Sequence, residues 1–73
     1  MSPEEENILK LIGNTIRKLR TKNNISQAQL AFEVKTDGRH IRRIEKGEVN
    51  LSFITLYRIS QVFDCSIDDL INH

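Results

Sequence analysis

Residues 36–47 read TDGRHIRRIEKG, and this stretch combines three arginines, a lysine and a histidine with two isoleucines. Ile41 and Ile44 share one face of a helix, which we expect to point into the core. The opposite side carries cations at i, i+3, i+4 and i+7, which are Arg39, Arg42, Arg43 and Lys46. A helix face that is only exposed to solvent would more often have acidic residues between its basic ones, because a row of like charges weakens an isolated helix. The pattern therefore predicts an amphipathic helix whose polar face meets an anion.

A second short helix is expected immediately before the basic one. Ser26 and Gln29 have the spacing of a capping box at the start of SQAQLAFEV. The residues expected to point inward from this helix are Leu30, Ala31 and Val34. A tight turn at residues 35–36 leads to Asp37, which can cap the basic helix, and Gly47 can end it. Two helices joined in this way form a helix-turn-helix, whose second helix lies in the major groove of DNA.

The rest of the chain offers three more helix starts and no strand-like alternation. The expected caps are Ser2 with Pro3 and Glu5, Ser52, and Ser66 with Asp69. The expected apolar stripe of the first helix is Ile8, Ile12, Ile16 and Leu19, and that of the fourth is Phe53, Leu56, Ile59 and Phe63. Five helices with short joints predict one compact all-α domain over residues 1–73.

Composition limits the classes of protein that this chain can belong to. Its 73 residues leave room for one domain, and a single cysteine excludes an internal disulfide. Apolar runs are too short for a membrane span or a signal peptide, so we expect a cytoplasmic protein. Residues 10–46 hold ten Lys or Arg against three acids, a net charge of +7, between acidic ends. This asymmetry hints at an anionic partner for the middle of the chain.

The residue patterns of enzymes and metal sites are not evident. His40 and His73 are far apart and lack acidic or cysteine partners at ligand spacing, so we expect no metal site. Cys65 has no neighbouring histidine or asparagine that would suggest a nucleophile, and filling the core is its expected role. No acid/base pair and no Gly-rich phosphate loop is present. We therefore expect neither catalysis nor a cofactor.

The motifs IRKLR, SQAQLA, IRRIEKG, ITLYRIS and CSIDDL, in this order and spacing, resemble the phage-repressor (Cro/cI, or Xre) helix-turn-helix family. The resemblance covers residues 12–71 and leaves residues 2–11 as an N-terminal extension of the first helix. It implies a five-helix, lambda-repressor-like fold with the helix-turn-helix at the second and third helices. It also implies double-stranded operator DNA as the ligand, and usually a two-fold homodimer on a palindromic site.

The resemblance assigns roles to particular residues. The positions that read bases in the family correspond here to Gly38, Arg39, Arg42 and Arg43. The positions that contact phosphates correspond to Gln27, His40 and Lys46. An arginine that ends the first helix pairs in several members with the glutamate of IExG, so Arg20 and Glu45 are interpreted as a structural ion pair.

This chain departs from the family pattern at two positions. Lys35 stands where the turn of the family usually has glycine, so we expect either a left-handed residue there at a cost of about 1 kcal/mol or a turn of a different shape. Gly38 has no side chain and can reach no base edge at the first reading position. Specificity would then depend on the arginines and, in part, on the shape of the DNA.

Some apolar residues near the fourth helix have no expected place in the core. Ile54 lies outside the stripe of that helix, and Tyr57 is three residues away. With Leu51 and Ile71 they are candidate contacts of a homodimer, which would place two recognition helices about one DNA turn apart. The alternative is that they are isolated exposed apolar residues, which are common.

The leading functional hypothesis is a sequence-specific regulator that binds double-stranded DNA, acts as a repressor and works as a homodimer without a cofactor. The first alternative is an antitoxin that neutralises a toxin protein and regulates its own operon. A further alternative is an activator of a restriction–modification operon, which would share the fold and the dimer. The sequence does not separate these roles, because all three keep the DNA-binding face.

Overall fold

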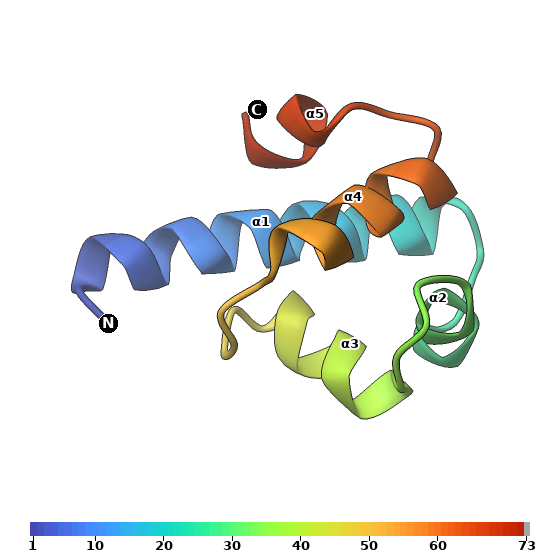
Figure 1. Ribbon diagram of the computed structural model, residues 1–73, viewed down its shortest axis with the longest axis horizontal. Coiled ribbons are helices and arrows are strands. Elements are labelled where there is room, and N and C mark those ends of the chain that lie inside the picture. Colours follow the sequence, from blue (N-terminus) through green and yellow to red (C-terminus); the bar gives the residue numbers. More distant parts are fainter. Residues whose placement is uncertain (73) are drawn as a thin grey trace.

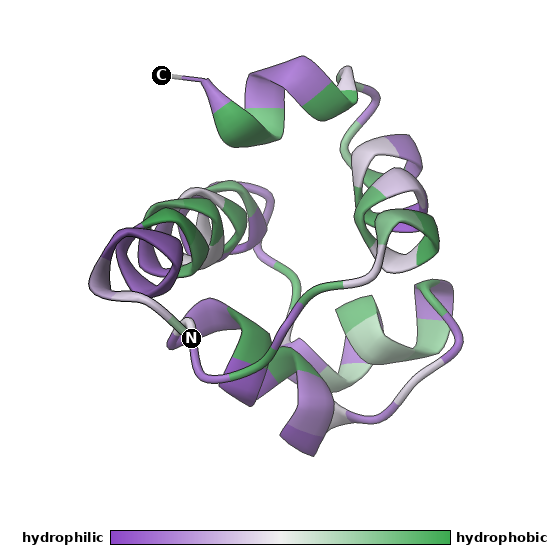
Figure 2. Ribbon diagram, turned by 60° about the vertical axis from the view of Figure 1, so that its left-hand side comes forward, coloured by the Kyte–Doolittle hydropathy of each residue, from purple (hydrophilic) through white to green (hydrophobic). Residues whose placement is uncertain are grey.

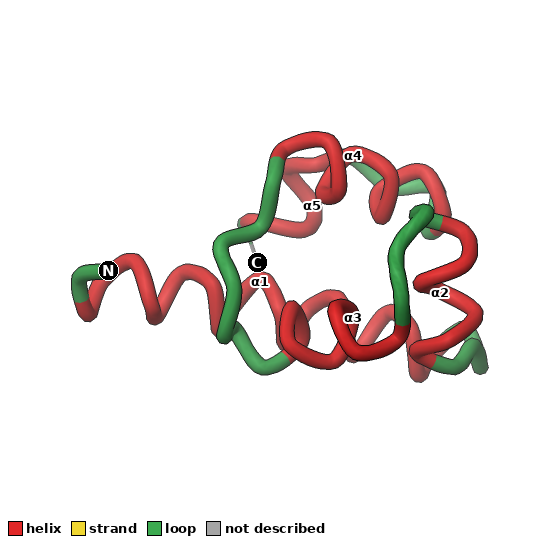
Figure 3. The backbone as a smooth tube through the Cα atoms, turned by 60° about the horizontal axis from the view of Figure 1, so that its bottom comes forward, coloured by secondary structure: helices red, strands yellow, loops and turns green. Residues whose placement is uncertain are grey.

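The structure is a computed structural model that describes residues 1–72, and these residues form five helices and no strand (Figure 1). The helices are α1 (Pro3–Lys22), α2 (Gln27–Glu33), α3 (Gly38–Glu45), α4 (Phe53–Val62) and α5 (Ile67–Ile71). The expected all-α fold, with its helix-turn-helix at α2 and α3, is confirmed. Short loops join the helices, and the first turns of α1 extend beyond the other four (Figure 3). His73 lies outside the described residues.

Each helix begins at a residue that the sequence marks as a cap. The side-chain oxygens of Ser2, Ser26, Asp37, Ser52 and Ser66 each accept a hydrogen bond from the backbone N–H three residues later. Such caps satisfy amide groups that have no partner inside the helix. The serine caps of α1 and α5 complete full capping boxes.

The capping box expected at the start of α1 is complete, whereas the one expected at the start of α2 is only half formed. At the start of α1 the Ser2 N–H donates to Glu5 Oε1 at 2.8 Å, and hydrogen bonds from the backbone and hydroxyl of Ser2 lower the pKa of Glu5. The capping box expected between Ser26 and Gln29 is wrong in one half. The Gln29 side chain instead donates to Glu33 Oε1 at 3.0 Å, one turn further along α2.

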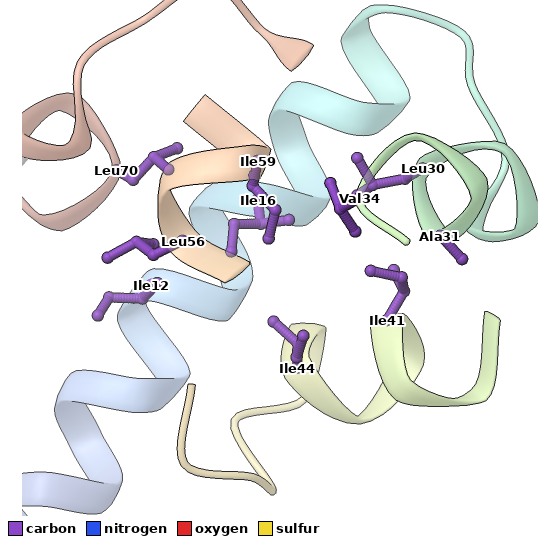
Figure 4. Close-up of a cluster of buried hydrophobic side chains, with 10 residues drawn as sticks. All are labelled: Ile12, Ile16, Leu30, Ala31, Val34, Ile41, Ile44, Leu56, Ile59 and Leu70. Atoms are coloured by element: carbon purple, nitrogen blue, oxygen red, sulfur yellow. The ribbon is translucent and has the colours of Figure 1, made fainter. Parts of the chain in front are cut away.

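Ten buried apolar side chains form one core between the helices (Figure 4). All five helices contribute to it, and so does Val34, which directly follows α2. They are Ile12, Ile16, Leu30, Ala31, Val34, Ile41, Ile44, Leu56, Ile59 and Leu70. The inward residues predicted for α2 and for the basic helix α3 are all among them. Because only Ile41 and Ile44 of α3 face this apolar core, the α3 ribbon in Figure 2 is mostly hydrophilic with hydrophobic residues between.

Two predicted core residues are wrong. Ile8 is 52% exposed, one turn before Ile12, the first buried residue of α1. Phe53 is 67% exposed, although it shares a face with Leu56, because it is the first residue of α4. A helical stripe predicts burial only where a neighbouring helix is present to cover it.

Candidate nucleic-acid interface

The cationic row of α3 consists of Arg39, Arg42, Arg43 and Lys46, and all four side chains are exposed. Within residues 1–72 none of them makes an ion pair or a side-chain hydrogen bond. Opposite this row, Ile41 and Ile44 are buried in the core. The structure therefore holds the helix by one side and leaves the cationic side open for an anionic partner.

The N-terminal ends of α2 and α3 lie close together beside this row. A Cβ atom added to Gly38 would lie 3.8 Å from the backbone of Ala28, which is ordinary van der Waals contact. Gly38 and Gln27 are half-buried there, and so is His40, whose N–H donates to Asp37 Oδ1 at 2.8 Å. The residues predicted to read bases and to contact phosphates thus come from two adjoining helix ends and from the exposed side of α3.

Glu45 joins three parts of the fold on the inner side of α3. Its carboxylate accepts from Arg20 Nε at 2.6 Å, from Arg20 Nη2 at 3.2 Å and from Gln27 Nε2 at 3.1 Å. Arg20 Nη1 also donates to the Ile25 carbonyl at 2.9 Å. The side chains of Arg20 and Glu45 are only 14% and 3% exposed, so this bidentate pair is largely shielded from water. We call Arg20, Gln27 and Glu45 the Glu45 network.

The Glu45 network changes the interpretation of Gln27. The sequence suggested a phosphate contact for its side-chain amide, but this amide already donates to Glu45. The phosphate contact stays a prediction, and the observed bond gives Gln27 a second role in fixing α2 against α3. The pairing of Arg20 with Glu45, by contrast, was implied by the family resemblance, and the two side chains do meet.

Two glycines bring α1 against the end of α3, and sequence reasoning missed this contact. A Cβ on Gly13 would lie 2.3 Å from the Ile44 carbonyl oxygen and 2.7 Å from that of Glu45. A Cβ on Gly47, whose φ is +72°, would lie 2.8 Å from the backbone of Lys10. A lone glycine inside a helical pattern was the available signal for Gly13.

The turn between α2 and α3 has the backbone shape expected from the departure at position 35. Lys35 has a φ of 63°, so a lysine occupies the left-handed region that favours glycine. Asn24, in the loop after α1, has a φ of 57°, which asparagine tolerates better. The predicted strain at Lys35 is thus located at the centre of the helix-turn-helix.

The predicted dimer residues do not share one environment. Ile54 and Tyr57 are exposed on α4, and Ile71 is exposed on α5. Leu51 instead is partly buried and packs against the core. Phe53 adds a third exposed large apolar side chain to α4, so this helix carries exposed apolar residues at i, i+1 and i+4, which we call the α4 patch.

Cys65 is the one cysteine of the sequence, and it is not in a disulfide. Cys65 is partly buried against the core, as expected, and burial raises its pKa, with smaller contributions from the charges of Asp69 and Asp64. A raised pKa keeps the thiol protonated and unreactive near neutral pH. Residues 1–72 contain no cluster of three metal-ligating side chains, and no helix among them is long and apolar enough to cross a membrane.

Comparison with known proteins agrees with this geometry. The model of the helix-turn-helix family HTH_3 matches residues 16–70, which is most of the chain. The chain belongs to this family. The expected resemblance to phage repressors is confirmed, because the crystal structure of the P22 c2 repressor in complex with a synthetic operator superimposes with a TM-score of 0.80. That chain is 32% identical, and the match covers 85% of this chain and 94% of the repressor.

Proteins with similar sequences include control protein C.BamHI of Bacillus amyloliquefaciens, which is 36% identical over 67 residues. That match covers 90% of this chain and 83% of the relative. An uncharacterized HTH-type transcriptional regulator of Archaeoglobus fulgidus is 38% identical over 55 residues, 75% of this chain and 79% of the relative. The restriction-modification controller protein C.AhdI of Aeromonas hydrophila has a TM-score of 0.81 at 29% identity, covering 85% of this chain and 94% of C.AhdI.

Proposed function

We propose that this protein is a sequence-specific transcriptional regulator that binds double-stranded DNA with α3 in the major groove. The observation that carries the proposal is the row of four exposed cations, which make no ion pair or side-chain hydrogen bond within residues 1–72, on a helix whose other side is buried in the core. Similarity to a repressor solved in complex with operator DNA supports this use of the surface. The role is binding in the cytoplasm, without a catalytic step or a cofactor.

In this proposal Arg39, Arg42 and Arg43 read base edges, since a guanidinium can donate to guanine O6 and N7 together. Gly38 leaves the first reading position without a side chain, so base-specific contacts there are absent. Lys46, His40 and Gln27 contact phosphates, which fix the position of α3 on the duplex but carry no direct sequence information.

The first test is fluorescence anisotropy on a duplex from upstream of the protein's own gene, against a scrambled duplex of equal length near physiological salt. We expect tighter, saturable binding to the native duplex. Arg39→Ala and Arg42→Ala should each remove about 1–3 kcal/mol of discrimination between the two duplexes. Thermal melting of both variants checks that they remain folded. Full discrimination in both variants would contradict the base-reading assignment, and equally weak binding of the unaltered protein to all duplexes would contradict the proposed function.

We also propose that the protein acts as a two-fold homodimer on a palindromic operator, through the apolar patch on α4. The patch consists of Phe53, Ile54 and Tyr57, and Leu51 and Ile71 are further candidate contacts. Burying three large apolar side chains is favourable for a chain of 73 residues, which has a small core. Ile54→Glu should produce a monomer in sedimentation at micromolar concentration. Phe32→Glu is the matched control, because Phe32 is an exposed apolar residue on α2; a dimer that persists in Ile54→Glu would place the interface elsewhere.

Repression is the mode of regulation that the similarity to the P22 c2 repressor favours. A second candidate is control of a restriction–modification operon, which the similarities to control protein C.BamHI and to the controller C.AhdI favour. Nothing in these similarities favours the antitoxin alternative. A transcription assay with promoters of the protein's own gene and of its neighbours separates the two modes: repression lowers transcript from the bound promoter, whereas activation of a neighbouring endonuclease gene raises it.

A further inference from the structure

One side of α1 carries a stripe of residues that neither the core nor the proposed DNA surface uses. The residues of this α1 stripe, spaced alternately four and three apart, are Glu4, Ile8, Leu11, Thr15, Lys18 and Lys22. Ile8 and Leu11 are 52% and 56% exposed, Thr15 is half-buried, and the three charged residues are exposed. Alternating spacings of four and three are those of residues that meet a second helix along a seam.

The order of charges along the stripe selects one direction of pairing. The acid of the stripe lies at the N-terminal end of α1, its two lysines lie at the C-terminal end, and its apolar residues lie between them. In a parallel pair of two copies, Glu4 would face Glu4 and Lys22 would face Lys22. In an antiparallel pair about a two-fold axis, Glu4 faces Lys22 of the second copy, and the alkyl stem of Lys18 covers Ile8. Opposite charges then meet at both ends of the seam.

A shallow hollow lies along the middle of this seam. A shallow groove of about 410 Å³ on this side of the protein is lined by Leu11, Asn14, Thr15, Lys18 and Leu19. In the antiparallel register Leu11 of the second copy lies opposite Thr15, beside this groove. We propose that the α1 stripe is a self-association surface, which pairs antiparallel with the α1 stripe of a second copy.

The position of the stripe determines what this pairing can do. Gly13 marks the side of α1 that packs against α3. Leu11 and Gly13 are two residues apart, so their directions from the helix axis differ by about 160°. The stripe therefore lies on the side of α1 away from α3, and the pair leaves both cationic rows open and directed outward. This contact joins copies bound at separate DNA sites, unlike the α4 patch, and this consequence rests on the proposed function.

The test of the pairing is sedimentation equilibrium of the unaltered protein and four variants between micromolar and submillimolar concentration. Leu11→Asp should abolish the association of dimers into larger assemblies while leaving the dimer formed through α4, and the exposure of Leu11 makes a folding defect unexpected. Glu4→Lys and Lys22→Glu each create like charges at two symmetric places, and each should raise the dissociation constant roughly tenfold. The double variant Glu4→Lys/Lys22→Glu restores both opposite-charge pairs and should return the constant to within about twofold of the original.

Rescue by the double variant is the decisive result, because a merely destabilised fold would not be repaired by a second charge reversal. All variants associating like the unaltered protein, or a double variant no better than the single ones, would overturn the proposal. The consequence for DNA is measured by capture of a labelled duplex on beads that carry a second, biotinylated duplex. The unaltered protein should bridge them, and Leu11→Asp should bind each duplex equally well without bridging. Absence of DNA binding with the charge rescue intact would contradict the proposed function and leave the pairing standing.

Discussion

The two sides of α3 differ in the number of contacts that they make with the rest of the protein. On the inner side Ile41 and Ile44 are buried, Glu45 accepts three hydrogen bonds, and the backbone carbonyls of the last turn lie against Gly13. On the outer side four cations have no partner within residues 1–72. The inner side thus determines where the outer side lies, so the geometry of the proposed DNA surface depends on contacts within the protein.

The largest expected effect comes from breaking the inner side at Gly13. Gly13→Ala would place a methyl group 2.3 Å from a backbone oxygen of α3, so α1 and α3 must separate. Overpacking of this severity costs about 3 kcal/mol of the free energy of unfolding, although alanine favours a helix more than glycine does. Urea unfolding followed by circular dichroism measures the change. Asn7→Ala on exposed α1 is the control and should be neutral or slightly stabilising; equal stabilities of the two variants would show that the helices adjust freely.

The next largest effect is expected in the Glu45 network. Glu45→Gln keeps the shape of the side chain but leaves the charge of Arg20, which is 14% exposed, without its partner. We expect a loss of about 2 kcal/mol, below the range for fully buried pairs because Arg20 retains the Ile25 carbonyl and some solvent. Glu48→Gln, at an exposed glutamate three residues later, is the matched control. The same unfolding assay checks both, and losses of equal size would mean that the network contributes no stability of its own.

Sequence patterns predicted the outer side of α3 better than the contacts of its inner side. The five caps and the inward isoleucines of α3 are local properties, which a few neighbouring residues determine, whereas the left-handed turn at Lys35 was implied by the family resemblance. The approach of Gly13 to α3 is not local, because spacing within α1 does not say which helix packs against it. Gln27 illustrates the same limit: its position at a helix start was evident, whereas its bond to Glu45 depends on how three elements converge. Ile8 and Phe53 lie at the ends of their apolar stripes. Their exposure could not be predicted without knowing where the neighbouring helices end.

A third prediction concerns the outer side, where a substitution should leave the fold intact. Lys46 is exposed at the end of α3, and its removal should weaken binding to operator and to scrambled DNA alike. In Lys46→Ala the slope of log affinity against log salt should become shallower by about one unit, since one fewer counterion is released. Anisotropy titrations at several salt concentrations measure this slope, and melting should match that of the unaltered protein. An unchanged slope would remove Lys46 from the phosphate contacts and restrict the open surface to the arginines.

The smallest effect lies in the turn that joins the two helices of the motif. Lys35 has a φ of 63°, and Lys35→Gly removes the steric cost of a side chain in that conformation. Part of this gain is offset because glycine has more freedom in the unfolded chain, so the net stabilisation should be about 0.5–1 kcal/mol. Asn24→Gly is the matched comparison at a φ of 57°, and its gain should be smaller because asparagine already tolerates the left-handed region. Equal gains at the two positions would mean that strain at Lys35 is no greater than at Asn24. Unchanged DNA affinity in Lys35→Gly would show that the lysine side chain at this position has no effect on the placement of α3.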